Sequence, residues 1–98
     1  MRNSDIGFLT TLESVIQARL QSPIEGSYTS ELVAGGRQRI AQKVGEEAVE
    51  LALAAASGNR EATMNEAADL LYHVLVMLNE QAIQLADIVA TLEQRHAP

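Results

Sequence analysis

The sequence predicts an all-α protein, a bundle of about four to five helices with a central antiparallel helix hairpin. From Arg37 to Ala56 the chain has no proline and is rich in strong helix formers. Next comes Ser57-Gly58-Asn59, where the glycine suits the left-handed residue ending one helix and the asparagine suits the cap of the next. With only three aromatic residues, the core must be built from Leu, Val, Ile and Ala, which suits close-packed helices.

The first helix is expected over residues 5–21. Its apolar residues recur at three- and four-residue steps, as on one face of an amphipathic helix: Leu9, Leu12, Val15, Ile16 and Leu20. Ser4 and Asp5 are the candidate N-caps. Pro23 and Gly26 then mark a loop that separates this helix from the next.

A short helix of one or two turns is expected next, capped by Ser27 or Thr29 and ended by Gly35-Gly36. The two arms of the hairpin follow, over residues 37–56 and 60–81.

A last amphipathic helix is expected over residues 87–95, with its apolar residues at Ile88, Val89 and Leu92. No internal repeat or linker interrupts the chain, so residues 1–98 are predicted to form a single domain.

Charge and composition restrict the class of function. A net charge of −6 argues against general nucleic-acid binding, and the absence of cysteine excludes cysteine-ligated zinc. The first residues lack the pattern of a signal peptide, and no apolar stretch is long enough to span a bilayer. We therefore expect a cytoplasmic protein with no nucleic-acid or membrane partner. Because so small a domain is often stabilised by association, a homodimer is the expected assembly.

Four acidic residues lie at mirror-image distances from Gly58: Glu50 and Glu66 at eight residues, Glu47 and Asp69 at eleven. In a helical hairpin each pair reaches the same height, and the two levels are only ~4.5 Å apart. Carboxylates that converge so closely must take up protons or bind a cation. All-oxygen ligation favours Mg²⁺, with Mn²⁺ as the alternative, and such ions activate water for attack on phosphorus.

Asp69 is expected to be buried, because nearly all the other residues from 67 to 78 are apolar. The alternative for these acids is a solvated surface, with Asp69 merely paired to a basic side chain. Glu46, one position from Glu47, points about 100° away from it. It is a candidate base, a ligand of another ion or a solvated surface residue.

The candidate substrate-binding residues are basic or aromatic and flank the acids: Arg37, Arg39, Lys43, Tyr72 and His73. The basic ones suit phosphate binding. Lys43 is four residues before Glu47, so a structural ion pair is the alternative for it. His73 reaches the level of Lys43 in the hairpin, and for His73 and Tyr72 the alternative is packing in the core.

Longer strings in the chain resemble a known family. Glu47-x-x-Glu50 with Glu66-x-x-Asp69 resembles the metal signature of the all-α nucleoside-triphosphate pyrophosphohydrolases. Lys-Val-Gly-Glu-Glu at 43–47 and Asp-Leu-Leu-Tyr-His at 69–73 look like the phosphoribosyl-ATP pyrophosphohydrolases, enzymes of the second step of histidine biosynthesis. The resemblance covers nearly the whole chain.

This resemblance implies Mg²⁺-dependent hydrolysis of the α–β phosphoanhydride of phosphoribosyl-ATP, giving phosphoribosyl-AMP and pyrophosphate. It implies that Arg39 and Lys43 contact phosphates, and that dimers form in which helices pack into a shared bundle. The metal ligands would be Glu47, Glu50, Glu66 and Asp69, with Glu46 completing the catalytic acids. Two alternatives are a housekeeping pyrophosphohydrolase of non-standard nucleoside triphosphates and a non-catalytic helical dimerisation module.

Overall fold

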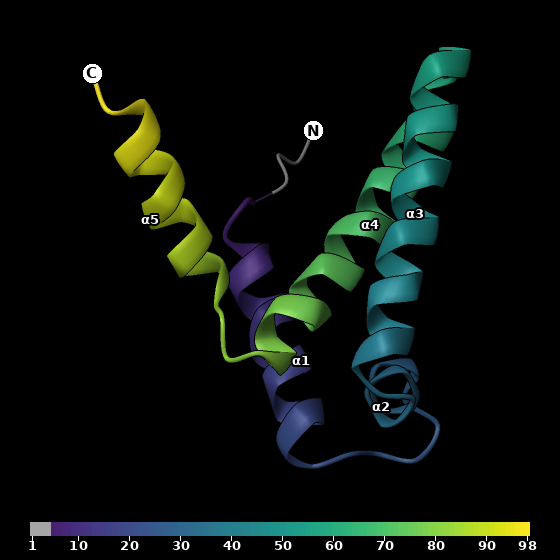
Figure 1. The fold of residues 1–98 in the computed structure, drawn as a ribbon, viewed down its shortest axis with the longest axis vertical. Helices are drawn as coiled ribbons and strands as arrows, with labels where there is room; N and C mark the ends of the chain where they lie inside the picture. The colour runs from purple at the N-terminus through teal and green to yellow at the C-terminus, as the bar shows by residue number, and fades with distance from the viewer. Residues whose placement is uncertain (1–4) are drawn as a thin grey trace.

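A computed structural model describes residues 5–98 and confirms the all-α class, with five helices and no strand over that range (Figure 1). The helices are α1 (Phe8–Gln21), α2 (Tyr28–Ala34), α3 (Arg37–Ser57), α4 (Arg60–Glu80) and α5 (Leu85–His96). Figure 1 shows α3 and α4 side by side, with α5 rising on the other side of the molecule. Among residues 5–98 no single helix is long and apolar enough to cross a membrane, although α4 and α5 together, bent by 102°, reach the required length and composition.

The turn at Gly58 forms the predicted hairpin. Gly58 has φ +77°, the left-handed conformation that glycine adopts without strain, and it ends α3. Asn59 caps α4, because its Oδ1 accepts a hydrogen bond from the Ala62 amide at 2.9 Å. The two longest helices of the chain therefore run antiparallel and in contact along their length.

The other helix starts show which local signals the structure uses. Ser27 caps α2, accepting from the Ser30 amide at 3.2 Å, so the first of its two candidate caps is confirmed. The first helix begins at Phe8, three residues later than predicted. Asp5 instead closes a turn ahead of α1, with its Oδ1 accepting from the Gly7 amide at 2.8 Å. Ser4 lies outside the described residues.

α5 begins two residues earlier than predicted, because Asp87 accepts a hydrogen bond from the Gln84 amide at 2.9 Å and so extends the first turn. Buried Glu13 of α1 also holds this end. Its Oε2 accepts from the Leu85 amide at 2.7 Å and from Nδ2 of Asn79 at 2.9 Å. One carboxylate of α1 thus ties the end of α4 to the start of α5.

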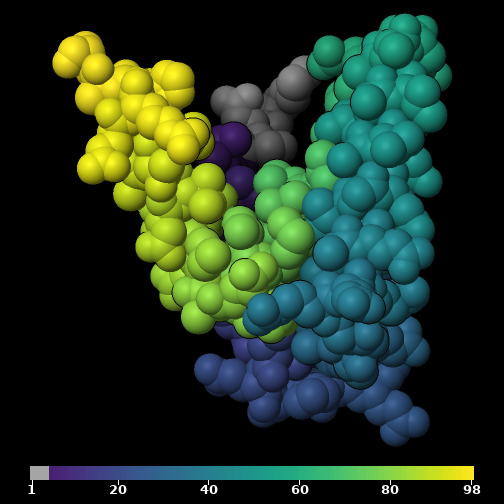
Figure 2. Space-filling view, viewed as in Figure 1, coloured from purple at the N-terminus to yellow at the C-terminus, as the bar shows by residue number. Residues whose placement is uncertain are grey.

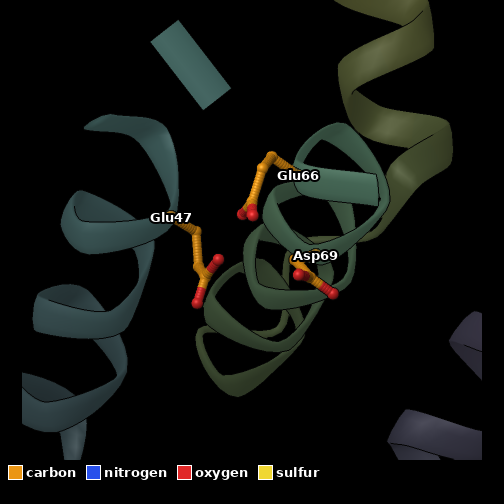
Figure 3. A group of neighbouring side chains, drawn as sticks. All are labelled: Glu47, Glu66 and Asp69. Carbon is orange, nitrogen blue, oxygen red and sulfur yellow. The ribbon is translucent and has the colours of Figure 1, made fainter. Parts of the chain in front are cut away.

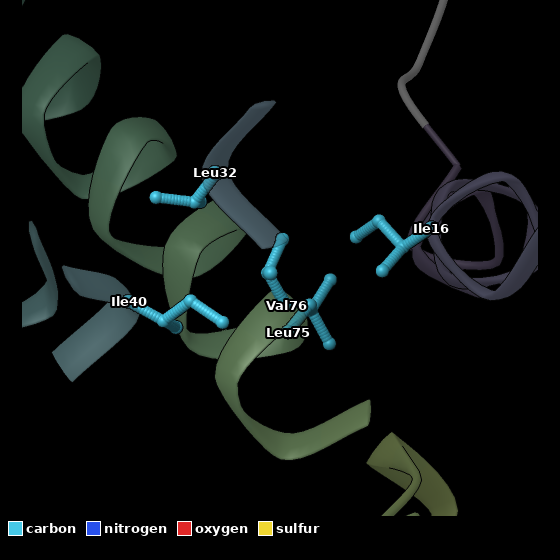
Figure 4. Packing of buried hydrophobic residues seen from close by; sticks show 5 residues of the cluster. All are labelled: Ile16, Leu32, Ile40, Leu75 and Val76. Atoms are coloured by element: carbon cyan, nitrogen blue, oxygen red, sulfur yellow. The ribbon is translucent and has the colours of Figure 1, made fainter. Parts of the chain in front are cut away.

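The hydrophobic core lies at the open end of the hairpin, away from the Gly58 turn. Its fully buried side chains come from four helices and are Ile16, Leu32, Ile40, Leu75 and Val76 (Figure 4). Ile40 is near the start of α3, whereas Leu75 and Val76 are near the end of α4. Within residues 41–72, all of which the structure describes, the one buried residue is Glu47. The outer half of the hairpin therefore projects beyond the core.

Candidate active site

Three of the four predicted acids meet across the hairpin. Glu47 of α3 points towards Glu66 and Asp69 of α4 (Figure 3), and one carboxylate oxygen from each lies within 4.8 Å of the other two. Glu50 is exposed and lies outside this group of three. Three residues of helix turn its side chain about 60° away from that of Glu47, so the two do not face α4 equally. A metal-binding role for Glu50 stays a prediction.

The buried member of the group is Glu47, with an exposed fraction of 7%, while Glu66 is partly buried and Asp69 is exposed. The expectation that Asp69 is buried is therefore wrong. The apolar residues around Asp69 do not guarantee a covering layer: Leu71, two residues on, is 40% exposed. The buried carboxylate is instead that of Glu47, on the facing helix α3.

Two oxygens in this group lack protein partners. Oε2 of Glu47 and Oε2 of Glu66 are buried and accept no hydrogen bond from any group in residues 5–98. A buried acceptor without a partner costs about 1–3 kcal/mol, and more if it is charged. A bound cation removes that cost and the mutual repulsion of the three carboxylates.

The donor set fits a hard divalent cation. Oxygens bound to one Mg²⁺ at about 2.0–2.1 Å lie about 2.9–4.2 Å from each other, so the three acids need only small side-chain shifts to share an ion. The group offers carboxylate oxygens only, which suits Mg²⁺ or Mn²⁺ better than zinc.

Lys43 stands beside the acids as predicted. Its Nζ lies 3.5 Å from Oε1 of Glu47 and 3.5 Å from Oε1 of Glu46, so the ion pair is confirmed. Partial desolvation opposes the charge on this ammonium, but the nearby phenol of Tyr28 and the two carboxylates raise the pKa of Lys43. Lys43 is therefore a persistent cation at the edge of the acidic group.

Glu46 points away from the group of three. Its Oε2 accepts a hydrogen bond from Nε2 of Gln42 at 3.0 Å, and this bond together with the charges of Lys43 and Arg39 lowers the pKa of Glu46. A carboxylate with a lowered pKa is ionised at neutral pH, but it is also a weaker base. Glu46 thus lies close to the site through Lys43 but does not face α4.

The two arginines differ in position. Nε and Nη2 of Arg37 donate to the two carboxylate oxygens of Glu80 at 2.8 and 3.1 Å, which raises the pKa of Arg37 and lowers that of Glu80. This pair joins the two helices at the open end of the hairpin, about 15 Å along α3 from Glu47. Arg39 is exposed and, within residues 5–98, makes no ion pair. Arg39 is therefore the arginine available to a ligand.

Both aromatic candidates are bonded to α2. His73 is buried, with Nδ1 2.7 Å from the carbonyl oxygen of Asp69 and Nε2 2.8 Å from the hydroxyl of Tyr28. Because a carbonyl only accepts, Nδ1 carries the proton and the Tyr28 hydroxyl donates to Nε2. The Tyr72 hydroxyl is hydrogen-bonded to that of Thr29. The sequence assigned no role to Tyr28, although Tyr28 lies between Ser27 and Thr29, the two candidate caps of α2.

The fold and the site together define an all-α protein with a carboxylate cluster between two antiparallel helices, flanked by a lysine. This is the arrangement that the resemblance to the all-α pyrophosphohydrolases implies. Residues 9–96 match the family model described as phosphoribosyl-ATP pyrophosphohydrolase. The chain belongs to this family.

Curated relatives agree with that assignment. The chain is similar to the histidine biosynthesis bifunctional protein HisIE of Shewanella oneidensis, with 53% identity over 89 residues, which cover 91% of the chain and 42% of the relative. For the protein of the same name in Photorhabdus laumondii, identity is 49% over 91% of the chain and 44% of the relative. For the protein of the same name in Yersinia pestis, identity is 47% over 95% of the chain and 46% of the relative. The chain thus spans less than half the length of these relatives.

Proposed function

We propose that this chain hydrolyses phosphoribosyl-ATP to phosphoribosyl-AMP and pyrophosphate, the second step of histidine biosynthesis. The observation that carries the proposal is the family match, which runs from residue 9 to residue 96 and so includes every residue of the acidic group. Residues 1–98 act in this proposal as one domain. Its location is the cytoplasm, where phosphorylated nucleotides are made and retained.

The proposed metal is Mg²⁺, with Mn²⁺ as the alternative, held by Glu47, Glu66 and Asp69, and by Glu50 after a change of its side-chain rotamer. When bound, such an ion neutralises phosphate charge and lowers the pKa of a coordinated water. The buried Oε2 atoms of Glu47 and Glu66 support this assignment, because neither has a hydrogen-bond partner within residues 5–98 and Lys43 pairs only with Oε1 of Glu47.

The chain's own residues then have separate tasks. Lys43 donates N–H groups to phosphate oxygens, with Arg39 reaching the same chain of phosphates from the preceding turns. Glu46, adjacent to Lys43, orients the attacking water and accepts its proton. The water oxygen attacks phosphorus, the bridging P–O bond of the anhydride breaks, and pyrophosphate leaves. Arg37 can contact substrate only if its ion pair with Glu80 breaks. Tyr72 and His73 can do so through their polar atoms only if their hydrogen bonds to α2 break.

A direct assay tests the reaction. The purified protein is incubated with Mg²⁺ and either phosphoribosyl-ATP or a panel of nucleoside triphosphates, and pyrophosphate is measured. We expect release from phosphoribosyl-ATP that stops when EDTA removes the metal. Turnover of the panel alone would support the housekeeping alternative instead. Turnover of neither substrate, with no rise in melting temperature on adding Mg²⁺, would support the non-catalytic module.

We also propose that the chain forms a homodimer through α5 and the outer part of the hairpin. No residue of α5 is buried, although Val89 and Leu92 form an apolar stripe on it. Figure 2 shows α5 as an arm that stands apart from the hairpin. On α4, Met64 and Leu71 are also exposed. A second copy of the chain presents the same apolar surfaces, so an isologous contact covers both sets.

Leu92→Glu is expected to convert this dimer to monomer, because it places a charge in the apolar stripe at a cost that the partner cannot offset. Sedimentation velocity at micromolar concentration measures the change. Gln94→Glu is the matched control: it adds the same charge to α5 about 160° away around the helix, and should leave the mass at that of two chains. A wild-type chain that sediments as a monomer at every concentration would contradict the dimer.

A further inference from the structure

Tyr28 is the open member of an aromatic group at the start of α2. It is 45% exposed, whereas His73 behind it is 6% exposed. Its ring centroid lies 5.7 Å from that of His73, with the ring planes at 79°, and 6.2 Å from that of Tyr72. The ring therefore rests against two other rings on one side while a large part of it remains open to solvent.

Hydrogen bonds hold this ring in one orientation. The Tyr28 hydroxyl donates to Nε2 of His73, and Nδ1–H of His73 donates to the main-chain carbonyl of Asp69. Asp69 is also the residue that contributes its carboxylate to the acidic group. The Tyr28 ring is thus fixed, through one buried histidine, to the helix that carries two of the acids. A ring fixed in advance loses little conformational entropy when a ligand binds.

The position of Tyr28 follows from the hairpin. His73 lies one turn beyond Asp69 on α4, and Lys43 one turn before Glu47 on α3, so both lie about 6 Å from the acids towards the open end. Figure 1 shows α2 at this end, against the lower part of α3. The Tyr28 hydroxyl is 2.8 Å from Nε2 of His73, so Tyr28 lies at this same end of the hairpin. Lys43 and Tyr28 therefore both lie on the open-end side of the acids.

This arrangement suits the parts of a nucleotide. The acidic group with its cation and Lys43 suit the phosphates, and the next part of the ligand beyond them is the sugar with its planar base. His73 cannot contact the base directly, because both its ring nitrogens are engaged. Tyr72 is less exposed than Tyr28. Of the three rings in this group, Tyr28 is therefore the one that offers an open face.

We propose that Tyr28 is a specificity-determining residue that stacks on the purine base of the substrate, with His73 as the positioning residue that holds its ring. This inference deepens the proposed function and rests on it. Stacking of a base on an aromatic side chain corresponds to a factor of roughly 5 to 150 in affinity. A planar base of either purine type presents such a face, so Tyr28 selects for the presence of a base, while the acids and Lys43 select for phosphate.

Two probes separate these contributions. Binding of ATP and of inorganic tripolyphosphate, each with Mg²⁺, is measured by calorimetry for the wild type, Tyr28→Leu and Tyr28→Phe. Tyr28→Leu should weaken ATP binding by roughly 5- to 150-fold and leave tripolyphosphate binding within about twofold. Tyr28→Phe keeps the ring and removes the hydroxyl that is bonded to His73, so it should weaken ATP binding by no more than about threefold, as His73→Leu does, and leave tripolyphosphate binding unchanged. With phosphoribosyl-ATP, Tyr28→Leu should raise KM by a similar factor and change kcat little.

A double-mutant cycle tests the role of His73. His73→Leu should weaken ATP binding less than Tyr28→Leu does, and should have no further effect in the Tyr28→Leu protein, because it acts only through the ring. Additive effects of the two substitutions would overturn the positioning role. Thermal melts of each variant confirm that the comparison is between folded proteins.

Several results would overturn the stacking role. One is ATP binding that is unchanged in Tyr28→Leu, and another is an equal loss of ATP and tripolyphosphate binding in that variant. A third is a loss of ATP binding in Tyr28→Phe as large as in Tyr28→Leu. A fourth is a Tyr28→Leu protein that no longer sediments as a dimer. The proposed function fails separately: a wild type that binds both probes but does not cleave phosphoribosyl-ATP refutes the reaction and not the stacking. A wild type that cleaves it, with an unchanged KM in Tyr28→Leu, refutes the stacking alone.

Discussion

Glu47→Gln is expected to lower the rate of phosphoribosyl-ATP hydrolysis by about 10²–10³-fold, the range seen when one preorganised electrostatic group is removed from an active site. Glu47 is the buried member of the acidic group, and one of its oxygens has no protein partner within residues 5–98. Glutamine keeps the shape of the side chain and removes the charge that a divalent cation needs. Pyrophosphate release, followed over a range of Mg²⁺ concentrations, measures the loss.

The same substitution should stabilise the metal-free protein, although it lowers activity. Neutralising Glu47 relieves its repulsion from Glu66 and Asp69, so the melting temperature without Mg²⁺ should rise, while the further rise on adding Mg²⁺ should disappear. Glu25→Gln is the matched control, because it makes the same change in the exposed loop between α1 and α2. If Glu47→Gln keeps both its turnover and its response to Mg²⁺, the metal does not bind at this group.

Leu75→Ala should cost about 2–5 kcal/mol in the free energy of unfolding, the range for truncating a buried leucine. Leu75 has an exposed fraction of 0% and lies in α4 at the centre of the core. Truncation leaves a cavity between α4 and its neighbours. For a chain of this length the melting temperature should fall by at least about 8 °C. Calorimetry at one protein concentration measures it, since the proposed dimerisation would make stability depend on concentration.

Leu53→Ala is the matched control for this prediction. It makes the same change in α3, where Leu53 is 67% exposed. Its effect should stay below about 1 kcal/mol, because little contact area is lost. Equal losses from the two substitutions would mean that the outer hairpin, and not the cluster around Leu75, is the main source of stability.

Much of this structure could be predicted from short-range signals. The left-handed Gly58 and the cap Asn59 are local features of the sequence, and they were enough to place the hairpin and bring Glu47, Glu66 and Asp69 to one height. Helix ends were less predictable. The start of α1 depended on a turn closed by Asp5 and the start of α5 on the carboxylate of Asp87, and neither has a pattern that stands out.

The features that could not be predicted depend on contacts between distant residues. The face that α3 turns towards α4 decides which acid is buried. The apolar residues around Asp69 predicted burial of Asp69, whereas the buried acid is Glu47. The bonds from Tyr28 to His73 and from Glu13 to Leu85 join residues 45 and 72 positions apart. No local pattern encodes such pairs, because each arises only when the helices have taken their places.

The separation of the core from the outer hairpin bears on how this fold changes over evolution. Residues 41–72 contribute no buried apolar side chain, yet they contain all the acids of the site. Substitutions in this stretch therefore alter the chemistry at little cost to folding within one chain, while the packed end keeps the helices in register. A scaffold divided in this way can acquire new substrates by drift in its exposed half, without first acquiring extra stability to survive the change.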